Sequence, residues 1–321
     1  MKYAALLTTV GAISLVPGIA GAQDYPSRHV TVINQTAAGS GPDVISRILG
    51  DRLGRKWGQQ VVTLNRQGAA GLVAAQAAAA AQADGYTLYM PTSTALVILP
   101  EANRTMTVDF ARDFVALGLV GETPMAIAVS VKLGMNTLAQ LISAAKAKPG
   151  DMLYAANNRG SVPHLVGAYL SRQAGISLTF VPQSGAPSAL NEVLGGRIPI
   201  IIESPSALSG AIQDGAIKVL AITSPERLLN FPDIPTVAET IPGFVITAWF
   251  ALLAPAGTPE PIVRKVAADL QAVLGEREVQ EKFEALGVYA RSMSPAATKQ
   301  FIRREREIWR PVIKEAGLAA P

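Results

Sequence analysis

The stretch MLYAANNRGSVPHLVGAYLSRQAGISLTFV, residues 152–181, contains a complete strand, helix, strand unit. The short apolar run MLYA leads through the turn ANNRGSVP into the amphipathic stretch HLVGAYLSRQAG, and the β-branched run SLTFV follows. Short runs of this kind, bounded by Gly, Ser, Asn and Pro, indicate strands. Strands that alternate with helices pack as a sheet covered by helices. This unit therefore predicts an α/β fold.

The same pattern recurs on both sides of this unit. Before it, HVTVIN (29–34) leads through QTAAGSGPD (35–43) into VISRILGDRLGRKWG (44–58). After it, IPIIIE (198–203) and IKVLAIT (217–223) are each followed by a turn and a helical stretch. We expect mostly parallel sheets with helices on both faces.

The pattern changes twice along the chain, which predicts two lobes. Consecutive strands without an intervening helix occur in VALGLVGETPMAIAVSV (115–131) and again in PGFVITAWFALLAPAG (242–257). We place the crossovers between lobes near residues 123 and 245. The first lobe is then 23–123 plus 245–321, and the second lobe is 124–244.

The N-terminus predicts export. A basic start is followed by the apolar stretch Tyr3–Ile19 and by the small residues Ala20-Gly21-Ala22. This is the pattern of a signal peptide, here residues 1–22, with cleavage expected before Gln23. The apolar stretch is shorter than the ~20 residues of a membrane-spanning helix and contains Pro17, which disfavours a permanent anchor. We expect a periplasmic protein.

Composition argues against disulfide bonds and against binding of nucleic acid. The chain has no cysteine, so disulfides do not stabilise it, and its net charge of +4 is dispersed. The basic segment FIRREREIWRPVIKEAG (301–317) alternates Arg with Glu, which is typical of a solvated helix face, and we expect no nucleic-acid partner.

Catalytic motifs are absent from the sequence. The only histidines are His29 and His164, and there is no HExxH, no Gly-x-Ser-x-Gly and no Walker loop. We predict no enzyme, no cofactor and no metal. A hydrolase stays open as a minor alternative, because catalytic triads combine residues that are distant in sequence.

Four turns have the composition of an anion site. In parallel sheets, ligands bind where strands end and helices begin, and each helix start offers unpaired N–H groups and a positive dipole end. In AAGSGPDV the small residues Ala38 to Gly41 allow close approach, and Asp43 follows at the helix start. Ser161, Ser184 and Ser204 head three similar turns as helix caps or ligand donors. The alternative is that all four turns only cap helices.

Two further groups are candidates. Thr92 and Ser93 follow the strand YTLYM and supply hydroxyl donors. Arg159 lies beside Asn157 and Asn158, where it could pair with a second ligand carboxylate, although an arginine that faces water is the alternative.

The chain resembles the substrate-binding receptors of tripartite tricarboxylate transporters, also called Bordetella uptake gene proteins. The resemblance runs through the whole mature chain. Among the segments that carry it are YPSRHVTVI, LNRQGAAG, ADGYTLYM, LNEVLGGRI, KVLAITSPERLLNFPDIPTVAET and WFALLAPAGTPEPIVRKV.

The resemblance implies a two-lobe periplasmic binding protein fold, type II-like, with a ligand cleft between the lobes. It implies a small carboxylate ligand and the membrane subunits of a tripartite tricarboxylate-type transporter as partners, and we expect a monomer. It adds His164 and the turn at Gln183 to the cleft. The predicted ligand-binding residues are Gln35, Ala38, Gly39, Ser40, Gly41, Asp43, Thr92, Ser93, Asn157, Asn158, Arg159, Gly160, Ser161, His164, Gln183, Ser184, Gly185, Ala186, Glu203 and Ser204.

The chain departs from the family pattern at residues that are expected to surround the ligand. Asn34-Gln35 stands where a Pro-Phe pair is common, VPQSGAP (181–187) replaces Val-Pro-Tyr followed by a basic residue and two glycines, and Glu203 replaces an Asp. The loss of aromatic residues at Gln35 and Gln183 makes the pocket more polar, which favours a polar aliphatic carboxylate over an aromatic acid. A periplasmic sensor that feeds a signalling receptor is the alternative function, since it would use the same cleft.

Overall fold

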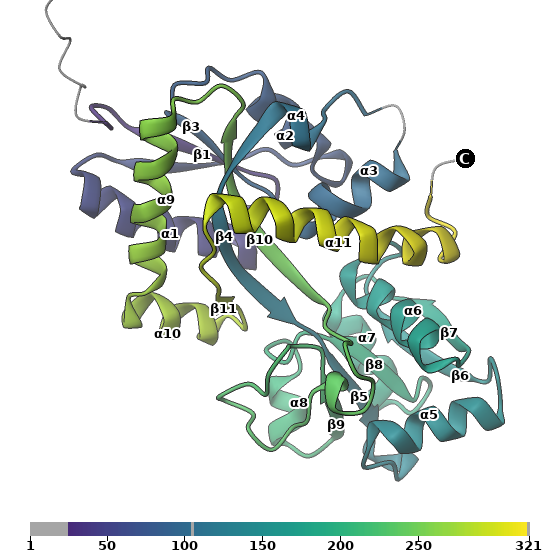
Figure 1. The fold of residues 1–321 in the computed structure, drawn as a ribbon. Helices are drawn as coiled ribbons and strands as arrows, with labels where there is room; N and C mark the ends of the chain where they lie inside the picture. The colour runs from purple at the N-terminus through teal and green to yellow at the C-terminus, as the bar shows by residue number, and fades with distance from the viewer. Residues whose placement is uncertain (1–24, 104–105, 320–321) are drawn as a thin grey trace, which may run out of the picture.

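The computed structural model describes residues 25–103 and 106–319, so the predicted signal peptide lies outside the described residues. These residues form two mixed sheets, each flanked by helices (Figure 1). We call the part built on the six-stranded sheet the first lobe, and the part built on the five-stranded sheet the second lobe.

The sheet of the first lobe has the strand order β11-β4-β10-β3-β1-β2. The bounds are β1 Val30–Asn34, β2 Val61–Asn65, β3 Thr87–Met90, β4 Phe114–Pro124, β10 Thr247–Pro255 and β11 Tyr289–Ala290. Strand β1 pairs in parallel with β2 and β3, with Thr31 opposite Val62 and Thr87. Strand β10 runs antiparallel to β3 and β4, and β11 runs antiparallel to β4.

The sheet of the second lobe has the order β7-β6-β8-β5-β9. The bounds are β5 Ala126–Ser130, β6 Met152–Ala156, β7 Leu178–Pro182, β8 Ile200–Glu203 and β9 Ile217–Ile222. Strand β6 pairs in parallel with β7 and β8, whereas β5 is antiparallel to both β8 and β9.

Both sheets are therefore mixed, and the expectation of mostly parallel sheets is wrong. The strand, helix, strand units do form parallel pairs, as between β6 and β7. The antiparallel pairs involve the strands that connect the lobes, because β4 continues into β5 with only Met125 between them and no crossover helix. The chain returns to the first sheet between Ile222 and Thr247.

The helices cover both sheets. Their bounds are α1 Gly41–Trp57, α2 Leu72–Ala79, α3 Leu99–Ala102, α4 Phe110–Asp113, α5 Leu138–Ala147, α6 Val162–Ala174, α7 Ala186–Leu194, α8 Ser209–Gln213, α9 Glu260–Leu274, α10 Arg277–Ala285 and α11 Pro295–Glu315. Among the described residues, no helix has the length and apolar character needed to cross a membrane.

The C-terminal helix α11 packs across the first sheet and reaches α6 of the second lobe (Figure 1). Trp309 of α11 and Trp249 of β10 are buried, and both donate through Nε1 to the Glu305 carboxylate, at 3.2 and 2.8 Å. The apolar core around them continues from the first lobe into the second. Burial of this kind is the main source of stability in a chain without disulfides.

Candidate ligand-binding site

A cavity of about 550 Å³ opens between the two lobes. The first lobe contributes the ends of β1 and β3 and the loop 67–71, and the second lobe contributes the ends of β6 and β8 and the start of α6. The lining residues are Gln35, Thr36, Ala37, Pro42, Gln67, Gly68, Ala69, Ala70, Gly71, Thr92, Ser93, Thr94, Thr123, Met125, Asn157, Ser161, Val162, Pro163, Glu203, Ser204, Ala248 and Phe250. Neither Lys, Arg nor His is among them.

On the side of the first lobe, the Gln35 side chain links the ends of two strands. Its Nε2 donates to Thr92 Oγ1 at 2.9 Å, and its Oε1 accepts from the Tyr89 hydroxyl at 3.2 Å. Ser93 beside it is buried, and its hydroxyl oxygen has no partner in the described chain. A buried hydroxyl without a partner is costly, so Ser93 is a candidate donor to a ligand or a water in the cavity.

On the side of the second lobe, Glu203 and Asn157 form a fixed pair. The Glu203 carboxylate accepts from Asn157 Nδ2 at 2.7 Å and from the Ser204 backbone N–H at 2.8 Å. Because the carboxylate needs a donor, this pair fixes the orientation of the amide and leaves Asn157 Oδ1 buried without a partner. Burial raises the pKa of Glu203, and the hydrogen bonds from Ser204 and Asn157 oppose that shift only in part.

The loop 67–71 also lines the cavity, and it was not among the predicted site residues. Ala69 and Ala70 have φ values of 46° and 55°, in the left-handed region that alanine rarely occupies. Within the described chain, no hydrogen bond uses the backbone N–H of Ala37, Ala69 or Ala70. Unusual backbone geometry of this kind is common at ligand sites. In the sequence, Gly68 and Gly71 on either side of the two alanines indicate a turn, but they do not show that the turn faces the cavity.

The predicted glycine-rich turn lies beside the cavity and does not line it. Ala38 to Gly41 are outside the lining, and Asp43 is buried beneath the turn. The Asp43 carboxylate accepts from the Gly39 N–H at 2.8 Å, from Arg47 Nε at 2.9 Å and from Asn65 Nδ2 at 2.8 Å. Burial acts to raise the pKa of Asp43, but these hydrogen bonds and the Arg47 charge hold it below its ordinary value. Asp43 therefore holds the shape of the turn.

Arg159 and the residue on either side of it lie outside the cavity. Arg159 Nη2 donates to the Ala316 carbonyl at the end of α11, at 2.5 Å, and Asn158 and Gly160 do not line the cavity. Ser161 does line it and caps α6 by accepting from the His164 N–H at 3.3 Å.

His164 is buried behind the first turn of α6. Its ring lies 4.0 Å from that of Phe180, and its Nδ1 accepts from the Gly160 N–H at 3.1 Å. Burial, with a smaller contribution from the Arg159 charge, lowers the pKa of His164 to about 4, so the ring is neutral at physiological pH.

The structure thus brings seven of the predicted residues to one cavity: Gln35, Thr92, Ser93, Asn157, Ser161, Glu203 and Ser204. It does not bring the turn at Gln183 to Ala186 there, where Gln183 Oε1 instead accepts from the Ser188 hydroxyl at 2.7 Å. Among the described residues, no group of three or more His, Cys, Asp or Glu side chains is placed to hold a metal ion.

Comparison with known proteins identifies the family. Residues 45–318 match the family described as "Tripartite tricarboxylate transporter family receptor". The chain belongs to this receptor family. Protein BugT of Bordetella pertussis is 33% identical over 322 residues, which cover 99% of each chain. Tripartite tricarboxylate transporter receptors are binding proteins, which confirms the prediction of a receptor that is not an enzyme.

Solved relatives confirm the α/β periplasmic binding protein fold. A Rhodopseudomonas palustris protein solved with adipate is 31% identical, with a TM-score of 0.76 over 92% of this chain and 99% of that one. MatC from the same organism, solved with bound malate, is 28% identical, with a TM-score of 0.71 over 90% of this chain and 100% of that one.

Proposed function

We propose that this protein is an exported periplasmic receptor that captures a small polar carboxylate between its lobes and delivers it to the membrane subunits of a tripartite tricarboxylate-type transporter. The observation that carries the proposal is the cavity between the lobes, where polar atoms of both lobes, Ser93 Oγ and Asn157 Oδ1, are buried without partners. The adipate and malate bound to relatives support a carboxylate.

The chemistry of the lining defines the kind of carboxylate. With no cationic side chain present, neutral donors hold the ligand: hydroxyl groups and the unpaired N–H groups of Ala37, Ala69 and Ala70. Asn157 Oδ1 is an acceptor, and Glu203 next to it disfavours a second negative charge. A carboxylate that also carries a donor, such as a hydroxy-carboxylate, satisfies both requirements.

Capture requires the lobes to move relative to each other. The lobe boundaries that we propose, near residues 123 and 245, lie close to the two points where the chain passes between the sheets. Rotation about these two connections would open and close the cavity around the ligand.

A thermal-shift experiment tests the proposal. The mature protein is heated with a panel of aliphatic di- and hydroxy-carboxylates that includes adipate and malate. We expect at least one compound to raise Tm in a concentration-dependent way, because a ligand that binds only the folded state stabilises it by about 2.7 kcal/mol at 100 times Kd. No shift with any compound, together with no carboxylate in native mass spectra of the purified protein, would overturn the proposal.

A matched pair of variants locates the site. Asn157→Asp places a second carboxyl 2.7 Å from Glu203 and removes the donor to it, so we expect ligand affinity to fall by about tenfold or more. Asn158→Asp makes the same change at the next residue, which is exposed and outside the cavity, and should leave affinity within about twofold. Equal losses in both variants would place the ligand elsewhere.

A further inference from the structure

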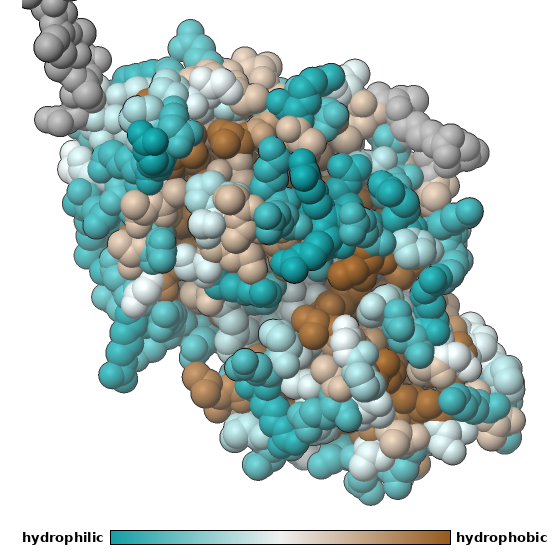
Figure 2. Space-filling view, viewed as in Figure 1, coloured by the Kyte–Doolittle hydropathy of each residue, from teal (hydrophilic) through white to brown (hydrophobic). Residues whose placement is uncertain are grey.

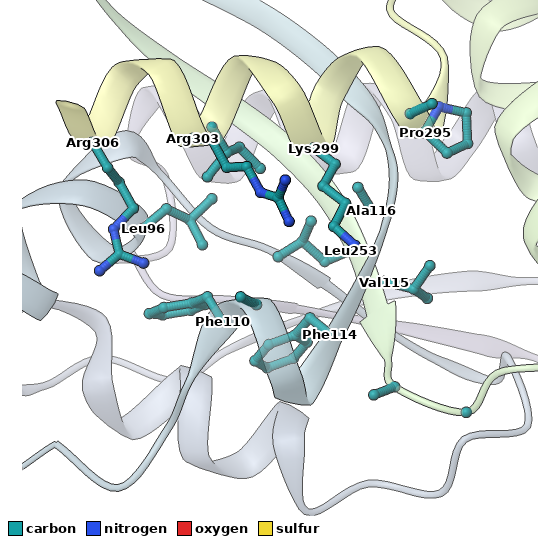
Figure 3. Close-up of a pocket in the computed structure, with 15 residues that line it drawn as sticks. Leu96, Phe110, Phe114, Val115, Ala116, Leu253, Pro295, Lys299, Arg303 and Arg306 are labelled. Atoms are coloured by element: carbon teal, nitrogen blue, oxygen red, sulfur yellow. The ribbon is translucent and has the colours of Figure 1, made fainter. Parts of the chain in front are cut away.

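A second cavity, of about 360 Å³, lies within the first lobe, between α11 and the sheet. Figure 3 shows its lining, with side chains of α11 on one side and those of β4, β10 and the segment before β4 on the other. It shares no lining residue with the cleft between the lobes. The proposed function does not use it.

The base of this cavity is apolar. Phe110 and Phe114 stack on each other with ring centroids 5.7 Å apart and planes 23° apart. Leu96 and Leu253 extend the apolar surface towards α11 (Figure 3). A surface of this kind binds the hydrocarbon part of a ligand.

The rim of this cavity is cationic. Lys299, Arg303 and Arg306 lie three and four residues apart on α11, so they share one face of the helix and reach over the apolar base (Figure 3). In the view of Figure 2, hydrophilic residues gather over α11. The cavity lining contains neither Asp nor Glu.

Two of these three cations have no carboxylate partner in the part of the chain that the structure describes. Arg306 lies 3.6 Å from Glu101, which also accepts from Arg310. In the described ranges, no carboxylate lies within 4.0 Å of Lys299 or Arg303. Long basic side chains often cover apolar surface with their stems, but here an open volume remains between them and the base.

We propose that this cavity binds an amphiphilic carboxylate, a molecule with one anionic head and a hydrocarbon body. The body would lie on Phe110 and Phe114, and Lys299 and Arg303 would hold the head. The volume is at the small end of ligand pockets, about 300 to 1,000 Å³, which favours a chain of medium length. This ligand differs in kind from that of the cleft, whose lining carries hydroxyl and amide groups and no cation.

Calorimetric titration with decanoate, kept below its critical micelle concentration, tests the proposal. We expect saturable binding by decanoate and at least about tenfold weaker binding by decylamine, which has the same chain and the opposite charge. Asn157→Asp in the cleft should leave the decanoate affinity unchanged. No saturable binding of decanoate, or equal binding of decylamine, would overturn the proposal.

Three variants separate the cavity from general surface adsorption. Arg303→Gln should weaken decanoate binding about fivefold or more, whereas Arg304→Gln, which removes the same charge from the next exposed position of α11, should not. Ala116→Leu fills the cavity from the sheet side and should abolish binding while the thermal transition stays cooperative. Binding that survives both Arg303→Gln and Ala116→Leu would contradict the proposal.

A vesicle experiment identifies the source of the anion. Phosphatidylglycerol vesicles are sedimented with the wild-type chain and with Arg303→Gln. We expect neither protein to sediment with the vesicles. A free amphiphile can place its hydrocarbon body in the cavity and its head at the rim, whereas a lipid that stays packed in a bilayer cannot. Sedimentation of the wild-type chain alone, without calorimetric binding of decanoate, would assign these charges to a membrane surface and overturn the proposal.

Discussion

At the residue scale, Glu203 is the one ionisable side chain among the residues that line the cleft. Burial raises its pKa, so the folded protein keeps the proton at a pH where the unfolded chain has lost it. Its contribution to the free energy of unfolding therefore falls as pH rises from the ordinary glutamate value through the raised one.

Replacing this carboxyl should change that pH dependence. We expect Glu203→Gln to be more stable than the wild-type protein at neutral pH, and the difference to shrink as pH falls through the same window. Urea unfolding at several pH values measures it. Glu192→Gln is the control of opposite sign, because the Arg197 hydrogen bond lowers the pKa of that exposed carboxyl. A stability difference between Glu203→Gln and the wild-type protein that grows towards acidic pH would contradict a raised pKa of Glu203.

Individual side chains of the site were predictable where strand order alone positions them. Asn157 directly follows β6 and Glu203 ends β8. These two strands pair in parallel, so the two side chains meet at one edge of the sheet. For Arg159 the sequence leaves a ligand contact and exposure to water open, because the direction of its side chain depends on the end of α11, more than 150 residues away in the sequence. Sequence spacing carries no information about such a contact.

At the scale of elements, the loop 67–71 combines the geometry of the site with a local cost in stability. An alanine in the left-handed region is disfavoured by roughly 1 kcal/mol, which glycine avoids. We expect Ala70→Gly to leave the protein as stable or to stabilise it by about 0.5 kcal/mol. Ala77→Gly, inside α2, should destabilise it by about 1 kcal/mol. Chemical denaturation of both variants measures the change in the free energy of unfolding. An equal loss of stability in both variants would show that the loop is not strained.

The elements themselves were largely predictable, and their pairing was less so. The apolar runs became strands β1, β6, β7, β8 and β9, and the turns after them begin helices. Strands β4, β5 and β10 lie in the two segments where the sequence pattern changes. The sequence did not predict that these strands pair in antiparallel fashion, which depends on the direct connection of β4 to β5 at Met125. The alternation of apolar and polar side chains along a strand does not determine which strand it pairs with.

At the scale of the whole molecule, α11 links the lobes in addition to the two connecting segments. Its last turn accepts from Arg159 through the Ala316 carbonyl, and Glu315 pairs with Arg172 of α6. These contacts are exposed, and an exposed ion pair contributes about 0 to 1 kcal/mol.

Removal of these contacts should favour an open molecule. We expect Arg159→Ala/Arg172→Ala to increase the radius of gyration of the ligand-free protein in small-angle X-ray scattering, with up to about fivefold more of the open form. The ligand-bound value should stay unchanged. Arg310→Ala is the control, since it removes a pair with Glu101 inside the first lobe. The same increase in both variants would exclude a linking role for α11.

The absence of cationic side chains from the cleft lining also has a consequence for release. In the proposed function, oriented dipoles would hold the ligand, and dissolved salt screens dipoles far less than it screens a pair of full charges. The receptor would then retain its ligand across a wide range of ionic strength. If the lobes separate at the membrane subunits of a transporter, as the proposed function requires, water would replace these neutral donors one by one, and no ion pair would have to be broken before the molecule leaves.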